Sequence, residues 1–217
     1  MKLTNLLLIT IVSSILYSQQ PVDAVNKNTG NNVCEKSKLD LATGTQNPNG
    51  ECVKTVMGEI PSKDHMVSTL IFFPQSDSEI KEKTSFTVKT KTINLDTGFF
   101  SDPKVDYYTR PQTLGKNGFV QGHSHVTIQK LDGNKVPDPR KIAFFKGLND
   151  PAVNGGFLNV EVTGGLPAGK YRLCTMTASF THQPTLMPIA QRGSQDDCVR
   201  FTVVKGKGKG KKRKSHH

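Results

Sequence analysis

The sequence predicts an all-β protein: an antiparallel β-sandwich with an irregular segment before it and a disordered basic tail after it. Several segments alternate apolar and polar residues with a period of two, and clusters of Gly, Pro, Asn and Asp separate them. No segment keeps the i, i+3, i+4 apolar spacing of a helix for three turns. Roughly seven such strands in about 140 residues are typical of a sandwich that buries its own core.

The first segment, residues 1–18, is typical of a secretory signal peptide. Lys2 precedes an apolar run over residues 6–12, and that run is too short to span a membrane. Cleavage is expected after Ser18, or after Ala24, where small residues form a signal-peptidase pattern. We therefore expect a secreted, extracellular protein with no membrane span.

Residues 25–64 are expected to be irregular, because Asn, Gly, Thr, Ser and Lys dominate them and large apolar residues are few. In an exported protein, cysteines favour disulfides over free thiols or zinc ligands. Four cysteines allow three pairings. We expect Cys34 to pair with Cys52 and Cys174 with Cys198, since each pair closes a short, turn-rich loop.

Residues 65–204 are predicted to form the sandwich. Its expected strands read STLIFFP, SFTVKTKTINL, HSHVTIQKL, FLNVEV, KYRLCTMTAS and CVRFTVV. The segment GLPAGKYRLC, residues 165–174, resembles the corner between two late strands of immunoglobulin-like folds, which makes an immunoglobulin-like sandwich the expected architecture. Tyr171 lies three residues before Cys174, so their side chains should point to opposite faces, which argues against an antibody-type bridge.

The segment GHSHVTIQKL places His123 and His125 on the same face of a strand, about 7 Å apart. That spacing permits both to bind one zinc or copper ion, but a zinc site needs a further protein ligand. The sequence does not place His65 or His182 in space. We therefore expect the pair to donate hydrogen bonds to backbone carbonyls or polar neighbours, with no metal and no cofactor. A metal-binding enzyme centred on His123 and His125 is the alternative.

Other catalytic chemistry has little support in the sequence. No Gly-x-Ser-x-Gly motif occurs, and nothing selects a pair of carboxylates at the separation that glycoside hydrolysis needs. We therefore assign no catalytic residues and expect a protein that is not an enzyme.

The formal net charge of +11 is concentrated at the C-terminal end, and the rest of the mature chain is close to neutral. Residues 205–217 form a tail whose alternating glycines and like charges predict disorder. Such a tail is expected to bind polyanions through their phosphates or to act as a nuclear localisation signal. Its basic residues are Lys205, Lys207, Lys209, Lys211, Lys212, Arg213 and Lys214.

Five motifs together resemble a family of small secreted fungal proteins. They are GHSHVTIQ at 122–129, FFKGLN at 144–149, GLPAGKYRLC at 165–174, THQP at 181–184 and AQRGSQDDCVRF at 190–201. The resemblance implies an exported, disulfide-bonded protein, with many members in plant-associated fungi, and supplies no catalytic residues.

These observations favour a non-enzymatic fungal effector or cell-surface protein that binds a protein, cell-wall or host partner. A looser resemblance to rust-fungus effectors suggests a cysteine protease inhibitor as a further alternative, although NPNG and RPQ match the inhibitory loop motifs poorly. Entry into a host cell followed by accumulation in its nucleus is the alternative localisation.

Overall fold

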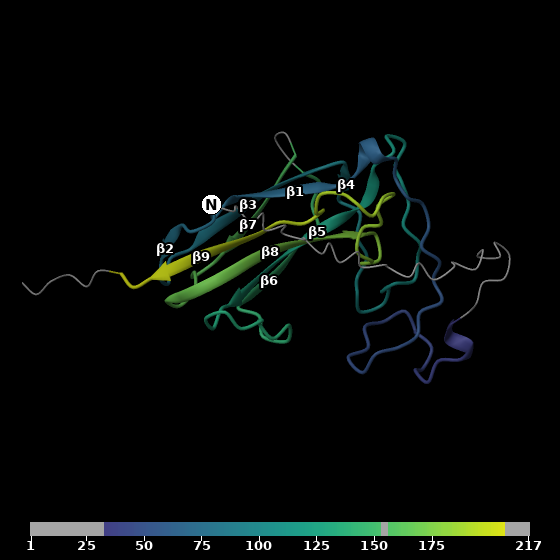
Figure 1. Cartoon of the computed structure of the whole chain (residues 1–217), viewed down its shortest axis with the longest axis horizontal. Coiled ribbons are helices and arrows are strands. Elements are labelled where there is room, and N and C mark those ends of the chain that lie inside the picture. The colour runs from purple at the N-terminus through teal and green to yellow at the C-terminus, as the bar shows by residue number, and fades with distance from the viewer. Residues whose placement is uncertain (1–32, 153–155, 207–217) are drawn as a thin grey trace, which may run out of the picture.

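The computed structural model describes residues 33–152 and 156–206, and it confirms the all-β prediction (Figure 1). Two short 3-10 helices, η1 (Val33–Glu35) and η2 (Lys63–His65), precede the first strand. The strands of the described residues are β1 (Ser68–Phe73), β2 (Glu79–Lys81), β3 (Phe86–Ile93), β4 (Leu95–Thr97), β5 (Val120–Lys130), β6 (Phe144–Leu148), β7 (Phe157–Val162), β8 (Gly169–Ser179) and β9 (Cys198–Val204). The predicted signal peptide and all of the predicted basic tail except Lys205 and Gly206 lie outside the described residues.

The strands form two sheets. One has the order β1-β3-β7 and is antiparallel throughout. The other has the order β2-β9-β8-β5-β4, and β6 also pairs with β5. Its long central pairs are antiparallel, whereas the three-residue strands β2 and β4 pair in parallel with β9 and β5. One edge of β5 is thus covered first by β4 and then by β6.

The hydrophobic core lies between the sheets, because alternate residues of each strand point inward. Val88 of β3 contributes to it from the smaller sheet, and Ile128 and Leu173 contribute from the larger one, all three with no solvent exposure. On β5, the residues of even number from Ser124 to Ile128 are buried on this inner side. His123 and His125 therefore project from the outer face of the larger sheet.

Both disulfides form as the sequence predicted. Cys34 and Cys52 are bonded in the N-terminal segment with their Cα atoms 5.6 Å apart. Cys174 and Cys198 face each other directly across β8 and β9, and their Cα atoms are 4.1 Å apart. This second bridge links two strands of one sheet and does not cross the core, in agreement with the expected positions of Cys174 and Tyr171 on opposite faces.

Tyr171 forms the corner that the sequence predicted at the start of β8. Its ring is buried against Phe201, and its hydroxyl donates a hydrogen bond to the carbonyl oxygen of Pro167 at 2.8 Å. This bond resembles the tyrosine corner of immunoglobulin domains, while the immunoglobulin-like strand arrangement stays a prediction.

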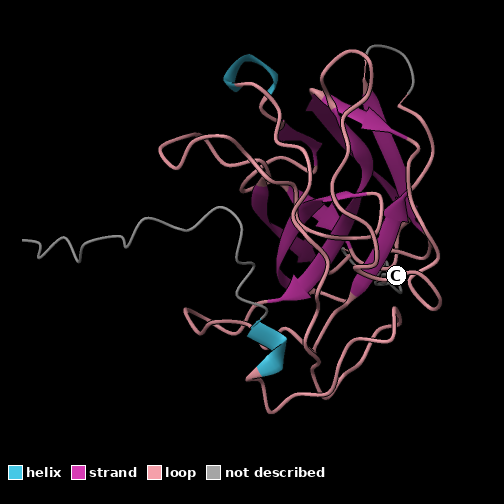
Figure 2. Cartoon of the chain, turned by 90° about the vertical axis from the view of Figure 1, so that its right-hand side faces the viewer, coloured by secondary structure: helices cyan, strands magenta, loops and turns pink. Residues whose placement is uncertain are grey.

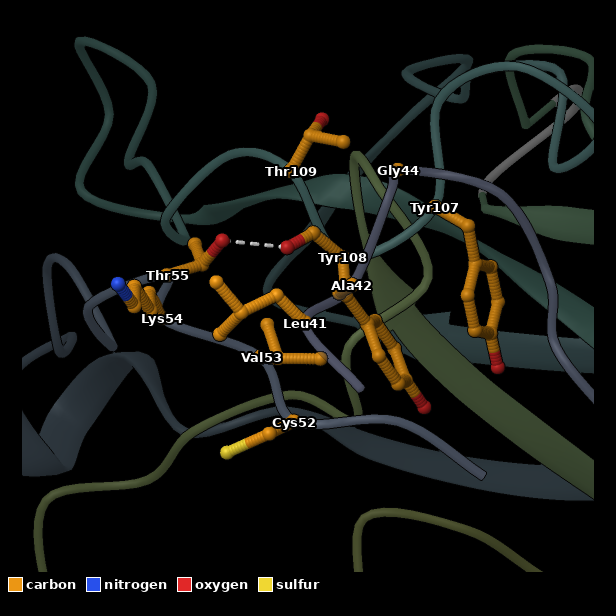
Figure 3. Close-up of a pocket in the computed structure, with 10 residues that line it drawn as sticks. All are labelled: Leu41, Ala42, Gly44, Cys52, Val53, Lys54, Thr55, Tyr107, Tyr108 and Thr109. Carbon is orange, nitrogen blue, oxygen red and sulfur yellow. Dashed lines mark hydrogen bonds between the residues drawn. The ribbon is translucent and has the colours of Figure 1, made fainter. Parts of the chain in front are cut away.

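Long loops and the N-terminal segment cover one end of the sandwich, beyond β4 and the start of β5 (Figures 1 and 2). The segment that contains Cys52 packs against the loop of Tyr107 and Tyr108, and the hydroxyl of Thr55 donates to the carbonyl oxygen of Tyr108 at 2.5 Å (Figure 3). Gln112 connects the same end to the loop after β8, since its side-chain amide donates to the carbonyl oxygen of Leu186 at 3.2 Å. No helix among the described residues is long and apolar enough to cross a membrane.

Candidate metal centre

Three histidines meet on the outer face of the larger sheet. His123 and His125 come from β5, and His182 comes from the loop that follows β8. One ring nitrogen from each lies within 4.8 Å of the others. The structure therefore brings together the two histidines singled out in the sequence with a third that sequence reasoning could not place.

His182 reaches the cluster through a tight reversal of the chain at the end of β8. Its φ of 75° lies in the left-handed region, and its amide donates to the carbonyl oxygen of Ser179 at 3.0 Å. Because β8 pairs with β5 in a register that places Ala178 opposite His123, this reversal folds the ring of His182 back over His123. The two rings pack edge to face with centroids 4.6 Å apart.

Two backbone carbonyls determine where the protons lie on His123 and His182. Nδ1 of His123 lies 3.0 Å from the carbonyl oxygen of Phe99. Nε2 of His182 lies 2.9 Å from the carbonyl oxygen of Ser101. A carbonyl oxygen only accepts hydrogen bonds, so each of these nitrogens must carry the ring proton. In the neutral rings, Nε2 of His123 and Nδ1 of His182 are then both lone-pair acceptors.

These two acceptor nitrogens face each other at 3.0 Å. Two lone pairs at this distance repel each other unless a proton or a metal cation lies between them. Burial, with repulsion from the neighbouring histidines, lowers the pKa of His123 to about 3, which disfavours a second proton on this ring. At neutral pH the arrangement is suited to a cation that accepts both lone pairs.

His125 supplies a third nitrogen without a partner. Nδ1 of His125 is buried and has no hydrogen-bond partner. No other buried side-chain nitrogen or oxygen among the described residues lacks one. Burial lowers the pKa of His125 to about 4, so this ring is also neutral at neutral pH. Its centroid lies 4.7 Å from that of His123. A neutral imidazole with an unused lone pair is the form that binds metals.

The spacing fits a transition metal after a small contraction. Zinc bonds imidazole nitrogen at about 2.0–2.1 Å, which places tetrahedral ligand atoms about 3.3 Å apart. The nitrogens of His123 and His182, at 3.0 Å, are already near this value, and all three ligand atoms lie within 4.8 Å of one another. Three histidines leave at least one coordination position open for water or another ligand.

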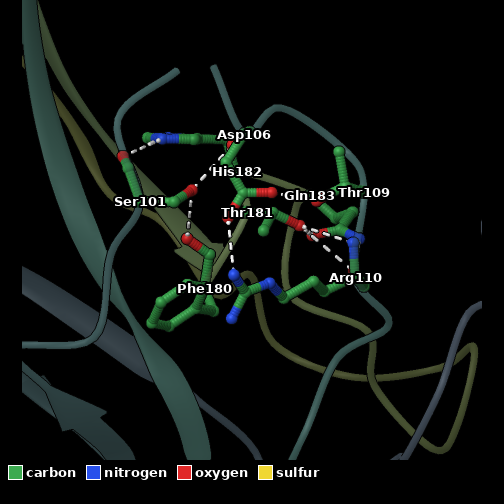
Figure 4. A network of polar contacts seen from close by, with 8 residues as sticks. All are labelled: Ser101, Asp106, Thr109, Arg110, Phe180, Thr181, His182 and Gln183. Carbon is green, nitrogen blue, oxygen red and sulfur yellow. Dashed lines mark hydrogen bonds and ion pairs between the residues drawn. The ribbon is translucent and has the colours of Figure 1, made fainter. Parts of the chain in front are cut away.

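A polar network holds the loop of His182 in place (Figure 4). The hydroxyl of Ser101 donates to the carbonyl oxygen of Asp106 at 2.7 Å, and the hydroxyl of Thr181 donates to that of Arg110 at 3.1 Å. The side-chain amide of Gln183 also donates to the Arg110 carbonyl. The carbonyl oxygen of Ser101 accepts a hydrogen bond from Nε2 of His182, so this contact sets the tautomer of the ring and the network sets its position.

A pocket of about 310 Å³ opens beside the cluster. His125 and His182 line it, whereas His123 is fully enclosed behind them. Phe145 stacks on His125 with centroids 5.3 Å apart, and Tyr107 stacks on His182 at 5.7 Å. The remaining walls are Gln46, Pro103, Tyr108, Met176, Thr177, Ala178, Pro184 and Asp196.

The expected hydrogen bonds from the histidine pair to the backbone are present for both rings. His123 bonds the carbonyl oxygen of Phe99 and His125 bonds the backbone of Met176, while Nδ1 of His125 has no partner. A third histidine lies within reach of the pair, so the further residue that a zinc site would need is available. The tail residues Lys207, Lys209, Lys211, Lys212, Arg213 and Lys214 lie outside the described residues.

Comparison with known proteins agrees with a fungal origin. Residues 69–204, which include all three histidines, match the family model described as the CLU5d N-terminal domain. "Pathogenicity cluster 5 protein d" of Colletotrichum graminicola is 46% identical over 167 residues, which cover 75% of this chain and 35% of that protein. The chain thus spans about a third of the length of this relative.

Proposed function

This chain belongs to the CLU5d N-terminal domain family, and we propose that it is a secreted, effector-like protein whose three histidines bind one transition-metal ion. The pathogenicity cluster for which its Colletotrichum relative is named supports an effector-like role. The two disulfides support export, because such bonds form in oxidising compartments.

One observation carries the metal site: two ring nitrogens, each left as an acceptor by a carbonyl bond on the far side of its ring, face each other at 3.0 Å. Moving a proton to the inner nitrogen of either ring would remove this repulsion. It would also break the bond to Phe99 or to Ser101 and leave a carbonyl unpaired, at a cost of about 1–3 kcal/mol. A metal ion removes the repulsion and keeps both bonds.

Three imidazole side chains favour zinc or copper, since imidazole suits both metals while hard cations prefer oxygen ligands. We propose that the protein acts by binding and not by turnover. Asp196, the carboxylate that lines the pocket, already accepts bonds from the hydroxyl of Thr175 at 3.0 Å and the amide of Thr177 at 2.8 Å. These bonds engage the carboxylate in the structure of the loop, while burial raises the pKa of Asp196 above its usual range.

The basic tail belongs to the same proposal as a separate element. Residues 205–217 would bind polyanions, or direct the protein to a host nucleus if it enters a cell. The sequence of the tail alone supports this part of the proposal.

Metal titration tests the site. Protein stripped with a chelator is titrated with Zn²⁺ and Cu²⁺ by calorimetry, and bound metal is counted by elemental analysis after gel filtration. We expect one equivalent of metal, and a loss of affinity of more than about 100-fold in His123→Ala, His125→Ala and His182→Ala, because even outer-shell partners of a metal contribute 10–100-fold. His65→Ala, outside the cluster, is the matched control.

Folding of each variant is checked by near-ultraviolet circular dichroism. Histidine ring ¹⁵N shifts provide a second measurement on the unaltered protein, since Nε2 of His123 and Nδ1 of His182 should both move when metal is added. Binding well below one equivalent, or binding that the three variants leave unchanged, would refute the proposed function.

A further inference from the structure

We propose that the pocket beside the three histidines binds a small aromatic molecule with adjacent hydroxyl groups, a catechol, whose oxygens coordinate the bound metal. This inference rests on the proposed function, because the metal is the anchor for the ligand. It names the chemical class of molecule that the site captures.

The pocket lies beside the side of the metal site where coordination positions would remain unfilled. His123 has no solvent exposure and lies behind the other two rings. His125 and His182 both form part of the pocket wall. A metal held by the three nitrogens would therefore lie next to this space, within reach of a ligand that enters it. At about 310 Å³, the space is large enough for a one-ring ligand together with water.

The walls favour a flat, largely apolar ligand. Phe145 and Tyr107 each stack on a histidine of the cluster, with interplanar angles of 26° and 30°. Tyr108 stacks on Tyr107 with centroids 4.1 Å apart, and Met176 lies opposite His125 on the neighbouring strand. Aromatic faces and a thioether around a few polar groups are typical of pockets that bind planar organic ligands.

The charges of the walls disfavour an anionic ligand. Neither lysine nor arginine is among the described residues that line the pocket, and Asp196 is the carboxylate among them. A phosphate or carboxylate would meet this carboxylate without a compensating side-chain cation. A catechol enters uncharged, and its hydroxyl groups can donate hydrogen bonds to an acceptor such as Asp196.

Binding to the metal removes a proton from the neutral catechol, and the resulting phenolate is a stronger metal ligand. The O–H bond of one hydroxyl breaks, its proton passes to the buffer, and the phenolate oxygen forms a bond to the metal in place of a water molecule. Nothing is oxidised or reduced in this step. A metal ion favours it because a bound cation lowers the pKa of the oxygen that it binds.

The test uses the full chain loaded with one equivalent of Zn²⁺ and 4-nitrocatechol as the probe, at a pH below the first pKa of the free probe, so that the probe enters uncharged and its visible absorption moves to longer wavelength when metal binding removes its proton. We expect a saturable 1:1 change that is absent without zinc. Phe145→Ala and Tyr107→Ala should keep the zinc and raise the Kd of the probe about tenfold each, since each removes an aromatic contact. Phe72→Ala, at an exposed phenylalanine of β1, is the matched control and should leave the Kd unchanged.

The outcomes separate this inference from the proposed function. Absence of bound zinc refutes both. Bound zinc with no spectral change refutes the catechol site alone, and so does a spectral change that Phe145→Ala and Tyr107→Ala leave unaltered, because the probe would then bind elsewhere. Unsubstituted catechol should displace the probe and inorganic phosphate should not. Displacement by phosphate would overturn the argument from charge.

Discussion

Acidification of the metal-free protein tests whether His123 and His125 are buried as neutral rings. Burial lowers the pKa of His123 to about 3 and that of His125 to about 4, whereas both are near 6.5 in the unfolded chain. Below pH 6.5 the unfolded state therefore binds more protons than the folded state. The stability that these groups contribute is complete above pH 6.5 and is lost as the pH falls toward 4.

The size of the effect follows from the number of protons taken up. Near pH 5 the unfolded chain carries almost two protons on these rings and the folded protein almost none, so the free energy of unfolding should fall by roughly 2–3 kcal/mol per pH unit. Between pH 7 and pH 5 the loss should be on the order of 4 kcal/mol. This is a large share of the 5–15 kcal/mol that holds a typical domain folded.

Urea unfolding in the presence of a chelator, followed by circular dichroism at several values between pH 7 and pH 4.5, measures this slope. His125→Phe removes one titrating ring and keeps an aromatic neighbour for Phe145, so it should lower the slope by about half. His65→Phe, outside the cluster, is the matched control and should retain the full slope. A stability that does not change between pH 7 and 5, or a slope that His125→Phe leaves unaltered, would refute the assignment of buried neutral rings.

Three further predictions concern the corner, the start of β5 and the tail. Tyr171→Phe should lower the free energy of unfolding by about 1–3 kcal/mol, because the Pro167 carbonyl loses its bond, and an unchanged urea midpoint would contradict the corner. Gly122→Ala should lower the free energy of unfolding by at least about 1–3 kcal/mol, because a Cβ there would lie 2.0 Å from the carbonyl oxygen of Ala178. A thermal midpoint equal to that of the unaltered protein would show that β5 and β8 can separate without cost. Deleting residues 205–217 should abolish heparin binding and leave the thermal midpoint nearly unchanged. In the full chain, the logarithm of the affinity for duplex nucleic acid should fall with the logarithm of the salt concentration at a slope of about −4 to −5 if about five cations meet phosphates. Full retention of heparin binding after the deletion would show that the basic surface lies elsewhere in the protein.

Periodicity revealed the long strands, and it did so because they carry the core. The expected strands around β1, β3, β5, β7, β8 and β9 all form. Most of them alternate the apolar residues that the sandwich buries, whereas β1 was expected as a short buried run and in fact leaves Leu70 and Phe72 exposed. The strands β2 and β4 were not predicted, because three residues are too few to show a period. The strand β6 was also missed: most of its residues remain accessible and its apolar residues do not alternate.

The disulfides and the tyrosine corner were also within reach of the sequence, because both depend on residues that are close along the chain. Cys174 and Cys198 lie 24 residues apart on strands that a turn-rich segment connects. Tyr171 and Pro167 are four residues apart, and the Leu-Pro-Ala-Gly segment before Tyr171 already signals the corner.

The metal centre depends on long-range contacts, and only the tertiary structure decided it. His123 and His125 share a face because a strand has a period of two, so the sequence alone determined this feature. His182 lies 59 residues from His123 and meets it only because β8 pairs with β5 in one register and then reverses. The carbonyls of Phe99 and Ser101, which determine the tautomers, belong to a loop with no periodic pattern. Backbone carbonyls leave no mark in a sequence, so the property that makes three histidines a candidate metal site arises from loop geometry.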